Sequence, residues 1–213
     1  MAEIPLPITV LQAAGTDPAL LDHAISLRFD LGQFDSRLTF SRSCPAFYVG
    51  QDGVMHQAAA NTPRFDYDPI TLSLRGLLVE EQRTNLLLSS QAFDSSNWVK
   101  SNVSVVANAA IAPDGTMTAD KVVGADGASA RYIGSSIATG TNITYAGSVY
   151  AKDAGLGFFR LNFSNFANDS RGVTFDLQSG TVRSVDASGP DFTAIGGSIT
   201  AVGGGWYRCT IVA

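Results

Sequence analysis

The chain has little of several features that would otherwise point to a function. Only two cysteines, Cys44 and Cys209, occur in 213 residues, and two distant cysteines do not make a disulfide framework. Charged residues make up 15% of the chain and the formal net charge is −5, so the clustered Lys and Arg that neutralise nucleic-acid phosphates are missing. No stretch approaches the roughly 20 apolar residues that span a bilayer. We therefore expect no nucleic-acid partner and no membrane insertion.

A secretory signal is also missing from the first residues. Glu3, Pro5 and Pro7 stand where such a signal needs a cationic start and an unbroken apolar run. We expect the protein to be made and folded in a cytoplasm. In that setting Cys209 is expected to be a small core residue rather than the partner of Cys44 in a bridge.

Reactive side chains lack the spacing that catalysis or metal binding requires. His23 and His56 do not have metal-ligand spacing, and neither HExxH nor CxxC occurs. Cys44 and His56 could meet in one hairpin as nucleophile and base, but nothing in the sequence orients them. Glu80 and Glu81, adjacent on a strand, would point to opposite faces and could not flank one glycosidic bond. The sequence therefore predicts a protein that is not an enzyme.

Alternating apolar residues and turn signals are abundant instead. Hydrophobic residues make up 45% of the chain, enough for a folded core. Short alternating runs after residue 90 predict an all-β sandwich. The residues it would bury are Phe159, Leu161, Phe163, Val173, Phe175, Leu177, Tyr207, Cys209 and Ile211. The expected turns are Pro113–Gly115, Asp126–Gly127, Thr139–Gly140, Ser179–Gly180, Gly196–Gly197 and Gly203–Gly205.

The region before residue 90 reads differently. Thr16-Asp17-Pro18 predicts the cap of a short helix over Ala19–Leu27. A hairpin is then expected around Gln51–Gly53. Further on, two prolines hold residues 64–68 extended. The strands expected here lie within residues 37–49, 54–60, 64–68 and 74–80.

The extended segment 64–68 has two distinct faces. Phe65 and Tyr67 would point to one side, because side chains alternate along an extended chain. Asp66 and Asp68 would point to the other side, together with Arg64. Since prolines bracket them and arginines are near, the two carboxylates are expected to form turn hydrogen bonds and local ion pairs, with Arg64 and Arg83 as neighbours, rather than to act in catalysis.

Exposed aromatic side chains could form a glycan site, because sugars stack on exposed rings. The candidates by residue type are Trp98, Tyr132, Tyr150, Trp206 and Tyr207. For each of them we expect a place in the core.

A set of longer motifs carries a family resemblance. P-R-F-D-Y-D-P at 63–69 is followed by G-L-L-V-E-E-Q-R-T-N-L-L-L-S-S at 76–90, and then by A-P-D-G-T-M-T-A-D-K-V at 112–122. V-T-F-D-L-Q-S-G-T-V at 173–182 and G-G-W-Y-R at 204–208 complete the pattern. From about Arg37 onward the chain resembles a family of bacteriophage and prophage virion proteins. Members typically carry this joint ahead of a jelly-roll domain similar to carbohydrate-binding modules.

The resemblance implies three parts: an N-terminal anchor segment at 1–36, a β-rich joint at 37–90 and a jelly-roll-like sandwich at 91–213. It implies a non-enzymatic virion structural protein, a tail fibre, head spike or decoration component, that docks on capsid or tail through residues 1–90. Such proteins usually assemble as homo-oligomers. The alternative is a glycan-binding adhesin whose sandwich recognises host-surface polysaccharide. Within the joint, residues 80–85 are expected to be structural.

Two further expectations come with the resemblance. Jelly rolls of this kind often hold a structural Ca²⁺, to which Asp94, Asp114 and Asp120 could contribute oxygen ligands. No other cofactor is expected. The family's jelly rolls usually continue beyond the W-Y-R strand, whereas the run Trp206–Ala213 ends the sequence. This predicts an unpaired edge or an incomplete sheet there, completed by a neighbouring subunit or by further chain.

Overall fold

The computed structural model describes residues 27–81, 83–127, 130–140, 143–165, 169–189 and 196–213. Within these ranges the fold is all-β, as predicted, and the only helical element is a 3₁₀ turn, η1 (Phe29–Leu31). The expected helix over Ala19–Leu27 lies outside the described residues except for its last residue, which is not helical. Most of the anchor segment and His23 lie outside them too.

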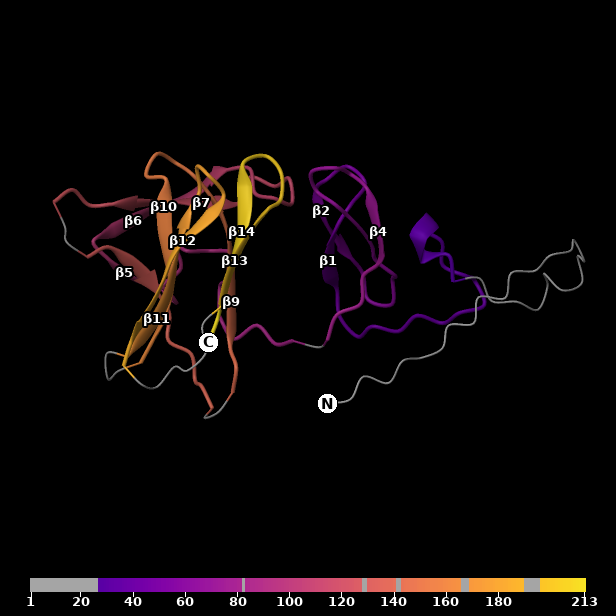
Figure 1. Cartoon of the computed structure of the whole chain (residues 1–213), viewed down its shortest axis with the longest axis horizontal. Helices are drawn as coiled ribbons and strands as arrows, with labels where there is room; N and C mark the ends of the chain where they lie inside the picture. Colours follow the sequence, from indigo (N-terminus) through magenta and orange to yellow (C-terminus); the bar gives the residue numbers. More distant parts are fainter. Residues whose placement is uncertain (1–26, 82, 128–129, 141–142, 166–168, 190–195) are drawn as a thin grey trace, which may run out of the picture.

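The strands fall into two groups that follow one another along the chain and lie side by side (Figure 1). Those of the joint are β1 (Ala46–Val49), β2 (Met55–Ala58), β3 (Phe65–Tyr67) and β4 (Leu74–Leu77). Those of the sandwich are β5 (Val99–Ser101), β6 (Val103–Ala110), β7 (Ala119–Gly124), β8 (Tyr132–Gly134), β9 (Ala146–Lys152), β10 (Phe158–Ser164), β11 (Ser170–Asp176), β12 (Thr181–Ser188), β13 (Gly196–Ala201) and β14 (Trp206–Val212).

The joint consists of two antiparallel hairpins, β1–β2 and β3–β4. The first is the hairpin predicted around Gln51–Gly53. In the second, Phe65 pairs with Leu77, and the strand predicted to reach Glu80 ends at Leu77. Continuing the register would place Val79 opposite Pro63, which has no N–H to donate, so the ladder stops there.

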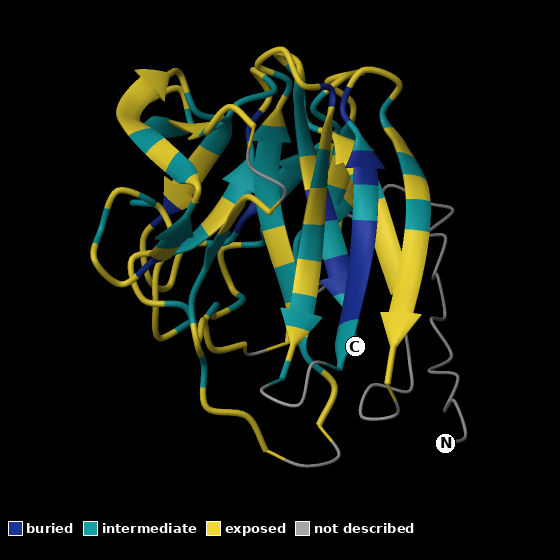
Figure 2. Ribbon diagram, turned by 90° about the vertical axis from the view of Figure 1, so that its left-hand side faces the viewer, coloured by how far each residue is buried: buried dark blue, intermediate teal, exposed yellow. Residues whose placement is uncertain are grey.

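Two three-stranded antiparallel sheets form the main body of the sandwich, in the orders β10-β11-β12 and β13-β14-β9. The central strands face each other: Val173, Phe175 and Leu177 of the β11 segment pack against Cys209 and Ile211 of β14. All five are at most 9% exposed, which confirms the predicted inward positions. In Figure 2 the buried residues accordingly gather on inner strands, and the surrounding strands alternate between half-buried and exposed.

Two features of the second sheet differ from expectation. β14 is not an edge: it pairs with β13 on one side and with β9 on the other, so the predicted unpaired edge is wrong for this strand. Gly196–Gly197 does not form a turn but begins β13. A Cβ on Gly197 would lie 2.7 Å from a methyl carbon of Val173, so glycine is required here for close approach of the two sheets.

The segment before β5 holds a packed pair of aromatic rings. The Phe93 and Trp98 rings pack with their centroids 4.9 Å apart, and Trp98 is 9% exposed. The Trp98 indole N–H donates to the Ser89 carbonyl at 3.0 Å. The predicted core position of Trp98 is confirmed.

The joint touches the sandwich directly. The Met55 backbone N–H donates to the Pro113 carbonyl at 3.2 Å. Tyr150 of β9 lies near the joint as well: burial raises the pKa of its hydroxyl, Arg208 opposes this rise, and the charges of Asp66 and Glu80 add to it.

Candidate functional site

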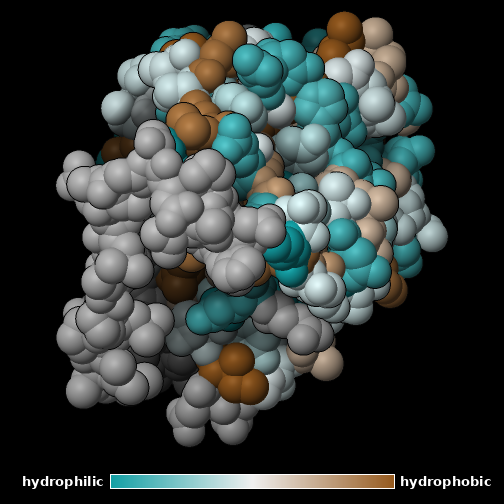
Figure 3. Space-filling model, turned by 90° about the vertical axis from the view of Figure 1, so that its right-hand side faces the viewer, coloured by the Kyte–Doolittle hydropathy of each residue, from teal (hydrophilic) through white to brown (hydrophobic). Residues whose placement is uncertain are grey.

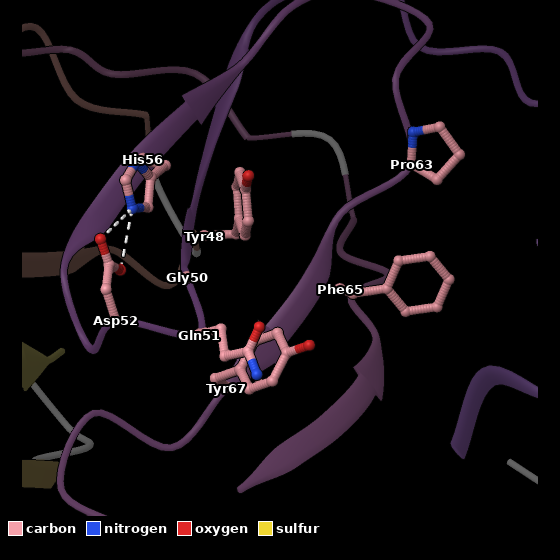
Figure 4. Close-up of a pocket in the computed structure, with 8 residues that line it drawn as sticks. All are labelled: Tyr48, Gly50, Gln51, Asp52, His56, Pro63, Phe65 and Tyr67. Atoms are coloured by element: carbon pink, nitrogen blue, oxygen red, sulfur yellow. Dashed lines mark hydrogen bonds and ion pairs between the residues drawn. The ribbon is translucent and has the colours of Figure 1, made fainter. Parts of the chain in front are cut away.

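An open groove of about 470 Å³ lies on the joint and is the candidate site (Figure 4). It combines aromatic rings from both hairpins with polar side chains of the first hairpin. The residues that line it are Tyr48, Gly50, Gln51, Asp52, His56, Pro63, Phe65 and Tyr67.

The first hairpin supplies one wall of the groove. Its register places Tyr48 directly opposite His56, and the two ring centroids are 5.9 Å apart. Asp52, in the turn, has its Oδ1 2.9 Å from His56 Nε2 and accepts the Val54 N–H at 3.1 Å. The hydrogen bond from His56 is the main reason why the pKa of Asp52 lies below its usual range. Gly50 is buried beneath this pair, where a Cβ would overlap the His56 ring.

The second hairpin supplies the opposite wall through Phe65 and Tyr67. Arg64, just before β3, and Asp66, within it, were predicted to face the other way, and both bond to the backbone of β1. Arg64 Nη1 donates to the Phe47 carbonyl at 2.7 Å, and Asp66 Oδ1 accepts the Val49 N–H at 2.9 Å. The polar face of β3 therefore holds the joint together, which leaves its aromatic face to line the groove.

Asp66 and Asp68 form the turn hydrogen bonds and ion pairs that the sequence predicts, but with a different arginine. Arg75 of β4 lies 2.7 Å from Asp68 Oδ2 and 3.8 Å from Asp66 Oδ2, whereas Arg64 and Arg83 pair with Glu80 and Glu81. Asp68 also accepts two backbone N–H groups of its own turn, which together with Arg75 lower its pKa to about 2. Both carboxylates are thus occupied as structural acceptors.

Glu80 and Glu81 have separate partners. Glu80 Oε2 lies 2.8 Å from Nη1 of the buried Arg64, while Glu81 and Arg83 form an exposed pair 2.6 Å apart. The two carboxylates are therefore not presented to one substrate as a pair.

Cys44 lies away from His56. It stands two positions before Ala46, the first residue of β1, which pairs with Ala58. At roughly 3.3 Å per strand residue, Cys44 is displaced by more than 10 Å along the hairpin from the level of Tyr48 and His56. The hairpin does not assemble a Cys–His pair.

The aromatic candidates of the sandwich differ in exposure. Trp206 is half-buried and donates its indole N–H to the Ile111 carbonyl at 3.1 Å, and Tyr207 packs against the core. Tyr150 is half-buried beside the joint. Tyr132 of β8 is 54% exposed, so its predicted core position is wrong. A single exposed ring offers no second wall for a ligand.

The carboxylates considered for Ca²⁺ do not fit a metal site. Asp120 accepts the N–H groups of Phe93 at 2.7 Å and Asn108 at 2.9 Å, and Asp114 accepts from the backbone and hydroxyl of Thr116. Among the described residues, no three His, Cys, Asp or Glu side chains come together as a metal site would require. Asp114 thus stabilises its own turn, and Asp120 ties the segment around Phe93 and strand β6 to β7.

Sequence reasoning placed Phe65 and Tyr67 on one face but did not find the groove. Tyr48 belongs to a different hairpin, and the packing of β1 on β3 brings it to the same hollow. The signal that could have found the groove is the alternation of side chains along β1 and β3. Tyr48 and Tyr67 each face away from the residues that tie β1 to β3.

Comparison with known proteins adds no family assignment: no protein-family model matches the chain, and no curated protein matches it. In the part of the chain that the structure describes, no helix has the length and apolar character needed to cross a bilayer.

Proposed function

We propose that the protein is a non-enzymatic structural component of a bacteriophage virion, a fibre, spike or decoration protein. In this proposal residues 1–90 attach it to the capsid or tail, and the sandwich is displayed outward. The resemblance of its motifs to phage and prophage virion proteins is the starting point. The protein would be made in the bacterial cytoplasm and reside in the virion.

The observation that carries the proposal is the contact between the two most specific motifs. Arg64 of P-R-F-D-Y-D-P is 4% exposed and bonds to Glu80 of the following V-E-E-Q-R-T-N-L-L motif. The same guanidinium reaches the Phe47 carbonyl of the first hairpin. The residues that define the resemblance are thus those that hold the joint in its fold, which is the reason to expect the same joint and the same role.

The composition of the joint surface supports attachment through it. Among the described residues of the joint, Ala58 is the one buried apolar side chain, while Ile70 and Val79 are 60% and 78% exposed. Figure 3, which faces the side of the joint, shows apolar patches between polar ones where the surface is not covered by grey atoms. Because so small a core stabilises two hairpins only weakly, packing against a virion partner would add stability.

A homo-oligomer is part of the proposal. The β6–β7 ribbon leaves Val106 and Val123, which share one face in its register, 52% and 38% exposed. A neighbouring copy that covered this face would bury both side chains.

Co-sedimentation tests the proposal directly. The full chain is mixed with isolated heads and isolated tails of a phage that encodes it, and its own mass is measured by light scattering. We expect a defined multimer that pellets with one of the two virion parts. A monomer that pellets with neither would overturn the proposal.

Two matched variants locate the attachment surface. Val79→Ser alters an exposed side chain of the joint region, and Leu156→Ser alters one of nearly equal exposure, 78% against 75%, in the sandwich. Attachment through residues 1–90 predicts that only Val79→Ser reduces pelleting. Loss with Leu156→Ser alone would place the attachment surface on the sandwich instead.

A further inference from the structure

The groove of the joint has features that attachment to a virion does not require. We propose that it binds a neutral saccharide, a single hexose or a short oligosaccharide, between Tyr48 and Tyr67. This goes beyond the structural role and does not depend on it. It also differs from the adhesin alternative considered above, because the site lies on the joint and not on the sandwich.

The apolar part of the lining suits one face of a sugar ring. Tyr48 and Tyr67 come from different hairpins and present aromatic surface to the same hollow, with Phe65 and Pro63 beside them (Figure 4). A pyranose has a face of C–H groups that packs on such rings. All four residues are half-buried, so they are held in place yet accessible from solvent.

The polar part of the lining supplies unused hydrogen-bonding groups. In the described part of the chain, the hydroxyls of Tyr48 and Tyr67 and the amide of Gln51 have no hydrogen-bond partner. Asp52 accepts from His56 and Val54 but, as a carboxylate, has lone-pair sites to spare. Donors and acceptors therefore stand beside the aromatic surfaces, which is the combination a ring bearing hydroxyl groups can satisfy.

The charge of the groove favours a neutral ligand. Asp52 is the only carboxylate among the lining residues, and as an aspartate it is ionised at neutral pH. An acidic sugar would be repelled by this charge. A proline-rich peptide offers carbonyl acceptors but few donors for the spare lone pairs of Asp52, whereas each sugar hydroxyl both donates and accepts. The volume, about 470 Å³, lies within the range of small-ligand sites.

Binding is tested on the full chain by calorimetry and by saturation-transfer NMR. The probes are maltotriose, cellotriose, chitotriose and lactose, with trigalacturonic acid as the acidic comparator and a proline-rich nonapeptide as the peptide comparator. We expect saturable binding of at least one neutral sugar, with a Kd between about 10 μM and 5 mM, and weaker binding of both comparators. No saturable binding of a neutral sugar at about 20 mM, or tighter binding of either comparator, would overturn the proposal.

Variants then locate the site. Gln51→Ala removes an exposed side chain with no partner, and Tyr67→Phe removes only a hydroxyl, so both should leave the fold intact. Each is expected to weaken sugar binding at least threefold, and Tyr67→Ala at least tenfold. Tyr132→Ala, an exposed tyrosine of the sandwich, is the control and should bind as the parent chain does. Unchanged binding by Gln51→Ala and Tyr67→Phe would refute the groove as the site.

The same variants separate this proposal from the structural one. Gln51→Ala should lose sugar binding while it still pellets with heads or tails. Loss of sugar binding with retained pelleting supports both proposals, whereas a parent chain that pellets but binds no neutral sugar refutes only this one.

Discussion

Removing the Arg64 guanidinium should loosen the joint without unfolding the sandwich. Arg64→Met keeps an apolar stem of similar length but loses the bonds to the Phe47 carbonyl, at 2.7 Å, and to Glu80, at 2.8 Å. Hydrogen bonds to charged groups contribute about 1.5–3 kcal/mol each where buried. Because the Glu80 side chain is 57% exposed, its bond to Arg64 should contribute at or below the lower end of that range. Loss of both bonds together is expected to destabilise the joint by about 2–4 kcal/mol. Glu80→Gln should cost about 1 kcal/mol or less.

Hydrogen exchange followed by mass spectrometry gives the local resolution that this prediction needs. A loss of about 3 kcal/mol corresponds to roughly a hundredfold faster exchange in peptides from residues 46–67. Peptides from β11 in the sandwich should not change. Arg83→Met is the matched control, since its pair with Glu81 is about 80% exposed on both sides and should contribute less than about 0.5 kcal/mol. Unaltered exchange in Arg64→Met, or equal acceleration in β11, would show that the guanidinium does not hold the joint.

Three more predictions concern the core, an ion pair and the thiols. Phe175→Ala, at a 0% exposed site, should lower the free energy of unfolding by about 3–5 kcal/mol in urea titrations. The control Val185→Ala, at an exposed site of β12, should change it by less than about 0.5 kcal/mol. Asp68 has a pKa lowered to about 2, so its contribution to stability is complete above the ordinary pKa near 3.8 and is lost as pH falls toward 2; carbon-detected NMR should give a midpoint near 2, and Arg75→Gln should raise it. Desolvation raises the pKa of Cys209 to about 12, so a thiol reagent at pH 8 should modify only the exposed Cys44 in the native chain and both thiols in denaturant, and equal native reactivity would contradict the burial of Cys209.

The parts of the fold that depend on local pattern could be predicted from the sequence. The alternation that buries Val173 and Phe175 follows from the period of a strand, and the turn at Ser179–Gly180 follows from glycine at a position with φ of 69°. Non-local pairing could not be predicted. Nothing in the sequence near Trp206–Val212 indicates that β9 and β13 flank this strand. Gly196–Gly197 has the sequence of a turn, and only the contact of Gly197 with Val173 shows why glycine occurs in a strand there.

The candidate site shows the same division. The faces of β3 were predictable because they depend on residues 64–68 alone. The ion-pair partner of Asp68 could not be predicted, because the β3–β4 pairing brings Arg75 to it rather than Arg64 or Arg83. The groove needs Tyr48 and Tyr67 from different hairpins, and no spacing along the sequence encodes the packing of one hairpin on the other.

The central position of β14 has a consequence for the order of folding. β9 pairs Lys152 with Trp206, so during synthesis it has no neighbour in its sheet until the W-Y-R strand has been made. The core-facing side of Phe175 on β11 stays open to solvent for the same interval, because the sheet that covers it is not yet complete. Such exposed strands are prone to aggregate. Pairing between distant segments also slows folding. The sandwich should therefore assemble late and as one cooperative step, with the local hairpin β11–β12 available first as a template.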